Sequence, residues 1–252
     1  MLGLGLLLAM RERRPAREHL PALAIVAAGV VVGFPLLTAL ALRHMTSAHS
    51  IVFIGLLPLA TAIFGVIRGG ERPRPAFWAF SALGGALVAG FAARQGAGGS
   101  LAGDGLMLAA IVLCGLGYAE GGRLSRRLGG WQVISWALVL SLPLTAALSL
   151  ATRPATFATV TLPQWLGLGY VSLFSMLIGF VFWYRGLAQG GIAAVGQLQL
   201  IQPFFGLALA ALLLGEAVTP AMLVVCVGVI GCVIGARRFA RARLTGAVQP
   251  AR

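Results

Sequence analysis

The chain has 252 residues, of which 59% are hydrophobic and only 10% charged, and its mean hydropathy is +0.95. A water-soluble domain has about 25% charged residues, so this composition excludes soluble enzymes and nucleic-acid-binding modules. The net charge of +13 comes from arginines that lie between long apolar stretches. The chain is therefore expected to be a polytopic membrane protein.

Eight apolar stretches are long enough, or nearly long enough, to cross a bilayer, which requires about 20 residues. A further apolar stretch, Met1–Met10, has only about half the length of a span. The predicted fold class is all-α, a bundle of membrane helices. The expected spans are 21–42, 51–67, 76–93, 105–122, 131–151, 165–185, 192–214 and 218–236.

The arginines divide unequally between the loops on the two sides of the membrane. One set of loops and the tail hold all of them except Arg43, Arg94 and Arg153, which lie in the alternate loops. Cytoplasmic loops carry the excess of basic residues, so we expect the C-terminus to be cytoplasmic. The positive charge then reflects topology, and no nucleic-acid partner is expected.

An offset of 145 residues aligns 48–90 with 193–235 without gaps. Arginines surround the first copy of a shared Gly-Glu motif and are absent around the second, so the charge rule predicts that one copy is inverted. Inverted repeats are typical of secondary transporters, whose substrate site lies near the membrane midplane between the repeats. The matched residues are Pro58 with Pro203, Gly70-Glu71 with Gly215-Glu216, and Pro75 with Pro220.

The repeat predicts two domains, 1–93 and 104–236, followed by a basic cytoplasmic tail at 237–252. The first repeat has no counterpart of the span at 105–122 and only a partial counterpart of the span at 131–151. We therefore expect the native protein to have about 40 further N-terminal residues, which is the length of one to two membrane-spanning helices.

Three segments of the second half carry a family resemblance: Gly179-Phe-Val-Phe-Trp-Tyr-Arg-Gly-Leu-Ala188, Gln202-Pro-Phe-Phe205 and Leu212-Leu-Leu-Gly-Glu216. With them the chain resembles the EamA-type drug/metabolite transporters from Met1 to about Arg238. The resemblance implies two inverted five-helix repeats, both termini cytoplasmic, in the bacterial inner membrane. It also implies small metabolites, often amino-acid-like, as substrates, the lipid bilayer as surroundings, a proton gradient as driving force, and no cofactor.

Two glutamines are the leading substrate-binding candidates. Ten helical residues from Ile192 rise about 15 Å, which places Gln202 near the membrane midplane. Gln199 lies one turn away on the same face, whereas Gln197 points elsewhere. Amide side chains bind polar groups without the desolvation cost of a full charge. Interhelical hydrogen bonding is the alternative role.

Glu120 is the ionisable residue placed inside a predicted span, which makes it the candidate for proton coupling. The alternative is an ion pair with Arg123 or Arg127, at helical spacing. The Gly-Glu motifs at Glu71 and Glu216 are instead interpreted as turn-forming, because a carboxylate next to a helix N-terminus interacts favourably with the helix dipole.

Tyr118 and Ser175 are further substrate-binding candidates within spans. Ser172, Ser175 and Gly179 share one helix face, so close helix packing is an alternative role for the serines. The sequence Trp183-Tyr184-Arg185 is typical of an aromatic belt and basic anchor at the membrane interface. Pro58 and Pro203 are expected to kink two spans at matched positions.

The leading hypothesis is a secondary transporter that exports small polar metabolites by alternating access. A membrane-embedded enzyme acting on lipids or head groups is the first alternative, and a non-transporting remnant is the second. An enzyme needs a nucleophile, a general base or metal ligands. No catalytic residues are predicted, since the three histidines lie in loops. No metal site is predicted either, since the three cysteines lie in apolar stretches. The oligomeric state stays open, with a homodimer as one option.

Overall fold

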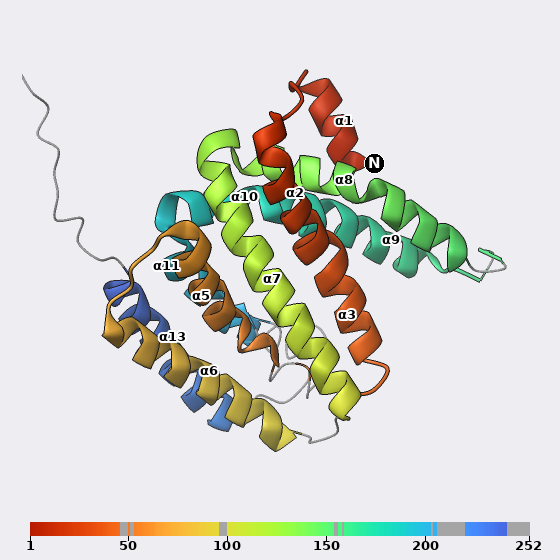
Figure 1. Ribbon diagram of the computed structural model, residues 1–252. Helices are drawn as coiled ribbons and strands as arrows, with labels where there is room; N and C mark the ends of the chain where they lie inside the picture. The colour runs from red at the N-terminus through yellow and green to blue at the C-terminus, as the bar shows by residue number, and fades with distance from the viewer. Residues whose placement is uncertain are drawn as a thin grey trace, which may run out of the picture.

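The computed structural model shows a bundle of helices (Figure 1). The described secondary structure is entirely helical, and the all-α prediction is confirmed. Among the described residues, four helices are long and apolar enough to cross a membrane: Arg17–Ala41, Leu101–Leu128, Gly130–Ala151 and Leu162–Gly190. The structure describes residues 1–45, 50, 53–95, 100–153, 156–157, 159–202, 204–205 and 220–240, and only the backbone of 91–95 and 221–223.

The helices of the first half are α1 (Leu2–Ala9), α2 (Leu20–Val26), α3 (Phe34–Ala41), α5 (Leu57–Gly69) and α6 (Pro75–Gln95). Those of the second half are α7 (Leu101–Leu128), α8 (Gly130–Ala151), α9 (Leu162–Tyr170), α10 (Gly179–Gly190), α11 (Ile192–Gly196) and α13 (Pro220–Phe239). Four further segments have other helical pairing: the 3-10 turns η1 (Arg17–His19) and η4 (Gln197–Ile201), and the π-helices η2 (Ala27–Gly33) and η3 (Val171–Ile178).

Several helices extend beyond the predicted spans because polar caps and glycines set their ends. Helix α7 begins at Leu101, four residues early, because the Ser100 hydroxyl accepts a hydrogen bond from the N–H of Gly103 at 3.1 Å. Helix α9 begins at Leu162 with a capping box of Thr161 and Gln164. The apolar pattern locates these two spans, whereas the local caps fix where they begin.

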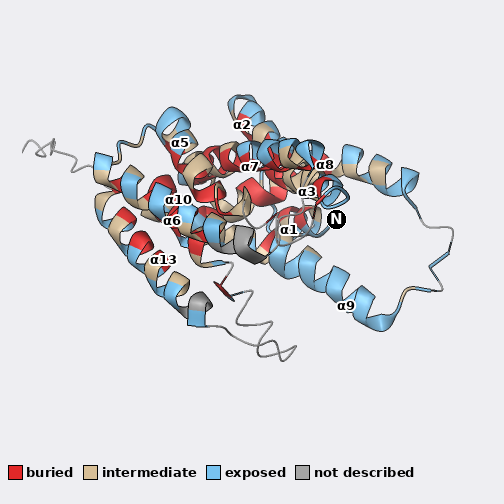
Figure 2. Ribbon diagram, turned by 90° about the horizontal axis from the view of Figure 1, so that it is seen from below, coloured by how far each residue is buried: buried red, intermediate tan, exposed pale blue. Residues whose placement is uncertain are grey.

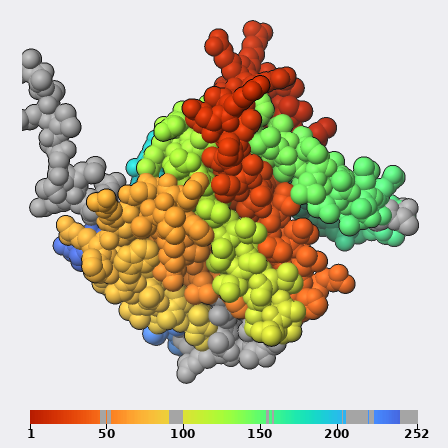
Figure 3. All heavy atoms as spheres, in the orientation of Figure 1, coloured from red at the N-terminus to blue at the C-terminus, as the bar shows by residue number. Residues whose placement is uncertain are grey.

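Helix α7 lies at the centre of the bundle, between α3 and α5 (Figure 1). The space-filling view shows α7 as a strip exposed between these two helices (Figure 3). Helices α8 and α10 also pack against α7, while α6 and α13 pair along one edge. Both halves of the chain thus contribute helices to the surroundings of α7.

Buried residues concentrate around α7, whereas α9 is exposed along its length (Figure 2). The main apolar cluster joins α2, α7, α8 and α10, and a second one joins α5, α6, α11 and α13. Large apolar side chains such as Leu162, Trp165 and Leu166 of α9 lie on the outside. An outward apolar surface of this kind suits a helix that meets lipid rather than water.

The two π-helices occupy matching places in the two halves. The offset of 145 residues takes η2 onto 172–178, and η3 is Val171–Ile178. The N–H of Phe34 donates to the carbonyl of Gly29, and the N–H of Gly179 donates to that of Phe174. These are equivalent i→i−5 bonds under the same offset. The domain limits at 93, 104 and 236 stay a prediction.

Pro58 was expected to kink the span at 51–67, and it follows a break in that span. It lies in the first turn of α5, where the N–H that proline lacks would have no helical acceptor. A turn precedes it, closed by a hydrogen bond of 2.8 Å from the Leu56 N–H to the Phe53 carbonyl. The expected span at 51–67 is thus interrupted by a turn directly before Pro58, and the proline starts the helix that follows. Its counterpart Pro203, like Glu216 and the tail from 241 onward, lies outside the described residues.

Candidate substrate site and charged network

Tyr118 lies where α7 crosses α10, and its ring meets two aromatic rings of that helix. The ring centroids lie 6.0 Å from Phe180 and 5.4 Å from Trp183. Phe34, at the start of α3, packs with Tyr118 around the same buried cluster. We name Phe34, Tyr118, Phe180 and Trp183 the aromatic cluster. Aromatic faces attract ammonium groups, so the cluster can bind the cationic end of a small molecule.

Trp183 supplies the cluster with an unused hydrogen-bond donor. Its indole N–H is buried and has no acceptor within the described part of the chain. A buried donor without a partner costs about 1–3 kcal/mol, so the site gains from a ligand that brings an acceptor. A carboxylate or carbonyl oxygen has the required chemistry.

Tyr184 is fully buried, and its hydroxyl donates to the carbonyl of Gly117 at 3.4 Å. Its ring fills the space beside Gly121, where a Cβ atom would overlap the ring. Tyr184 is therefore enclosed by the bundle and does not form part of an exposed aromatic belt. Helix α10 continues to Gly190, about two turns beyond Trp183, and a position of Trp183 at the membrane interface stays a prediction.

The three glutamines of the 192–202 segment differ in their surroundings. Gln199 is half-buried and donates to the carbonyl of Gly196 at 3.2 Å, while Gln202 is exposed. Gln197 is fully buried, and neither amide atom has a partner in the described residues. The 3-10 pairing of η4 changes the helical phase, so spacing in an α-helix could not predict which glutamine is enclosed.

Ser175 lies in η3 and is exposed. Within the described residues, no hydrogen bond or ring contact joins Tyr118 to Ser175, Gln199 or Gln202. The structure therefore groups Tyr118 with Phe180 and Trp183, which the sequence did not single out as site residues. The only sequence signal for them was their place in the Phe-Val-Phe-Trp-Tyr segment.

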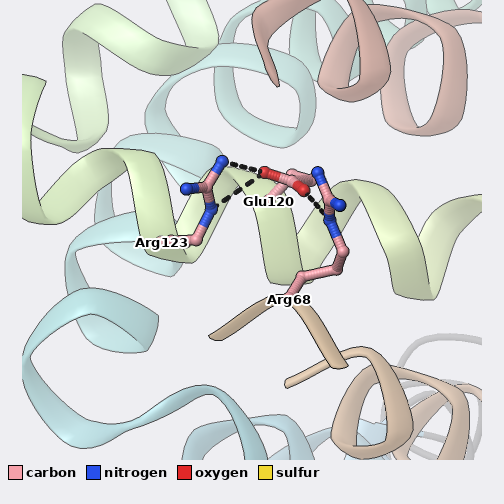
Figure 4. Close-up of polar contacts among 3 residues, drawn as sticks. All are labelled: Arg68, Glu120 and Arg123. Carbon is pink, nitrogen blue, oxygen red and sulfur yellow. Dashed lines mark hydrogen bonds and ion pairs between the residues drawn. The ribbon is translucent and has the colours of Figure 1, made fainter. Parts of the chain in front are cut away.

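Glu120 is fully buried and forms ion pairs with arginines from both halves of the chain (Figure 4). Arg123, one turn later on α7, donates from Nε and Nη2 at 3.1 and 2.8 Å. Arg68 reaches the other carboxylate oxygen from the end of α5. The pair with Arg123 follows from helical spacing, whereas Arg68 was missed because it lies 52 residues away in the chain.

Glu71 holds the start of α11 against α5. Its carboxylate accepts the N–H groups of Ile192 and Ala193 at 2.6 and 2.7 Å, and Arg126 Nη2 at 3.2 Å. Anionic groups are favoured at a helix N-terminus. The carboxylate of the first Gly-Glu motif thus caps a helix of the other half. We name Arg68, Glu71, Glu120, Arg123 and Arg126 the charged network.

The arginine-rich ends of several helices meet at this network. Arg126 and Arg185 line one cavity of about 540 Å³, and Arg123 and Arg127 line a smaller one beside His19. The N–H of Arg74 donates to the carbonyl of Phe239 at 3.0 Å. Loops that the charge pattern places on one side therefore lie together in space. Within the described residues, no group of three metal-ligating side chains occurs.

Residues 101–237 match the EamA-like transporter family. A Bacillus subtilis (strain 168) protein named uncharacterized transporter YdeK is 68% identical over 241 residues, covering 96% of this chain and 84% of the relative. The chain belongs to the EamA-like transporter family. It is therefore a multi-pass membrane protein of a transporter family.

Two more distant proteins are also similar to this chain. A Streptantibioticus cattleyicolor protein named probable terminal-alkyne amino-acid exporter is 28% identical over 223 residues, covering 84% of this chain and 71% of the relative. One crystal structure is 22% identical and has a TM-score of 0.78, covering 95% of this chain and 83% of that chain. The structural likeness establishes the fold alone.

Proposed function

We propose that this EamA-family protein is a secondary transporter that exports small amino-acid-like or drug-like metabolites across the bacterial inner membrane by alternating access. The observation that carries the proposal is the aromatic cluster, in which Tyr118 faces Phe180 and Trp183 and the indole N–H lacks an acceptor. The relative named as an amino-acid exporter supports the class of substrate.

The chemistry of the aromatic cluster matches the two ends of an amino acid. An ammonium group over an aromatic face gains about 0.5–2 kcal/mol, and the Trp183 N–H can donate to the carboxylate. Neither interaction requires a charged side chain within the bilayer, which would be expensive. Gln199, Gln202 and Ser175 complete the proposed substrate path with polar groups. The relatives' names, all transporters, favour this role over enzymatic chemistry on lipids.

Glu120 is the proposed acid for proton coupling. Arg68 and Arg123 belong to different halves of the chain, so a movement that separates α5 from α7 removes one of the two cations that face the carboxylate. The side with the charged network is the proposed cytoplasmic side.

Tryptophan fluorescence of the purified full chain tests the substrate site. Trp183 lies in the proposed site, so binding of an amino acid is expected to change the emission saturably. The variant Trp183→Phe is expected to lose that change, while Trp165→Phe, on exposed α9, is expected to keep it. The proposal is overturned if no amino acid or cationic drug changes the emission, or if Trp183→Phe responds as the parent does.

A further inference from the structure

The matched π-helices point to a feature of the transport cycle that neither the fold nor the family description assigns. Each lies in the middle of a long membrane helix, η2 within Arg17–Ala41 and η3 within Leu162–Gly190. π-Helical pairing is rare and is frequently found at functional sites. Its occurrence at equivalent positions of two differently sequenced halves indicates a shared purpose.

Glycines permit the π-helical pairing in both halves. A Cβ atom on Gly179 would lie 2.8 Å from the carbonyl oxygen of Phe174, five residues earlier. A Cβ atom on Gly33 would overlap the carbonyl oxygen of Ala28, again five residues earlier. The obstructing atom is backbone in both cases, so any larger residue has to push the carbonyl away from its i→i+5 geometry.

The π-helices also end at the aromatic cluster. Phe34 is the residue directly after η2. Phe180 is the second residue after η3, with Gly179 between them. Conversion of a π-helical run to α-helix displaces one residue, which rotates the distal segment by about 100° and moves it by about 1.5 Å. Such a conversion in η2 rotates Phe34 relative to α2, and one in η3 rotates α9 relative to Phe180 and α10.

A change between π- and α-helix suits a hinge in a membrane. Backbone N–H and C=O groups in hydrocarbon need internal partners, and both helix types pair them within the same segment. Unwinding a turn would instead leave several groups unpaired, each at a cost of a few kcal/mol. The packing of the flanking segments also differs, because α10 packs against α7 and α8 whereas α9 is exposed.

We propose that Gly33 and Gly179 are positioning residues for transport in the two halves, which allow η2 and η3 to alternate between π- and α-helix and so re-aim Phe34 at the substrate site and rotate α9 against α10. This inference rests on the proposed transport function. It adds that α3 moves relative to α2, and that α9 moves relative to α10. Its consequences do not depend on which substrate is carried.

Distance distributions between spin labels test the hinge without a substrate. In a full chain whose three cysteines are replaced, labels at Leu36 and Ile234 report on α3, and labels at Leu166 and Ile234 report on α9; all three positions are exposed. Two populations are expected for each pair. Gly33→Ala is expected to shift the ratio of the Leu36 populations by about tenfold or more, and Gly179→Ala that of the Leu166 populations.

Matched variants separate a hinge from a general packing defect. Gly167→Ala on α9, where a Cβ atom has nothing within 4 Å, is expected to leave both distributions unchanged. If the alanine variants fail to fold, deletion of the exposed Leu173 within η3 provides a second route. It removes one residue, restores α-helical phase and is expected to leave a single population for the Leu166 pair.

The outcomes of the distance measurement and of a flux assay are distinct. The hinge proposal is overturned if the distance distributions are unchanged in Gly33→Ala, in Gly179→Ala and in the deletion variant. It is also overturned if the parent shows a single population for every labelled pair. An effect in one half only overturns the pairing. Two populations that respond as expected, together with no flux of any small molecule, leave the hinge standing and overturn the transport function instead.

Discussion

Glu120 shows how much of the protein depends on one side chain. Its carboxylate lies between Arg68 of α5 and Arg123 of α7, so it both joins two helices and is the proposed site of proton uptake. A hydrogen bond to a charged group contributes about 1.5–3 kcal/mol. Its removal therefore has consequences for stability as well as for coupling.

The variant Glu120→Gln tests both roles. We expect it to unfold with a free energy about 1–3 kcal/mol lower than the parent, and its flux to lose its dependence on the pH gradient. Thermal unfolding in detergent and flux at several imposed gradients measure the two effects. Glu18→Gln, at an exposed carboxylate, is the control. A pH profile identical to that of the parent would assign Glu120 to the ion pair alone.

Residue contacts could be predicted from the sequence only where they are local. The Glu120–Arg123 pair follows from helical spacing, whereas Arg68 joins it through packing of helices distant in the chain. Tyr118 was recognised as a candidate because it is a polar aromatic residue within a span. Its partners Phe180 and Trp183 were not, because Trp183 was placed at a helix end that lies five residues further on, at Gly190.

At the scale of elements, Glu71 determines where α11 begins. The carboxylate binds the first two N–H groups of that helix from the loop that follows α5, at 2.6 and 2.7 Å. Gly65 and Gly69 bring α5 close enough for this contact, since a Cβ atom at either one would meet the Ile192 side chain at 3.0 or 2.8 Å. Small residues spaced by four allow such close approach in membrane helices.

The variant Glu71→Ala is expected to lower the free energy of unfolding by about 2 kcal/mol, since it leaves two helix N–H groups without acceptors. Glu71→Gln keeps one acceptor oxygen and is expected to lose about half as much. Thermal unfolding of both variants beside the parent measures the difference. If Glu71→Ala and the parent are equally stable, water or other groups accept hydrogen bonds from the first N–H groups of α11.

Apolar pattern and length locate the helices in the sequence, but they do not determine the helix type within each span. The segments η2, η3 and η4 sit within stretches that read as continuous α-helix. The i→i−5 hydrogen bonds donated by Phe34 and Gly179 depend on nearby glycines. Backbone carbonyl groups approach these glycines closely only when the chain is folded. The 3-10 pairing of η4 likewise altered which of the three glutamines is buried.

At the scale of the whole molecule, composition predicts the membrane bundle, and the arginine distribution predicts its orientation. The charged network brings arginines of α5 and α7 to one end of the bundle, and the N–H of Arg74 reaches the end of α13. Arginine-rich loops are expected to lie on the same side of the membrane. Contacts between them are therefore expected even when they are distant in the chain. The substrate could not be predicted, because backbone fold and helix pattern are common to carriers of many molecules.

Flux through proteoliposomes tests the central claim, transport of a small polar metabolite, most directly. Liposomes that contain the full chain and are preloaded with an amino acid are expected to take up the labelled form saturably, faster than empty liposomes. Gln202→Leu, at an exposed position of the proposed path, is expected to insert normally and to abolish that uptake. Uptake no faster than in empty liposomes, across a panel of amino acids and cationic drugs, would contradict the account.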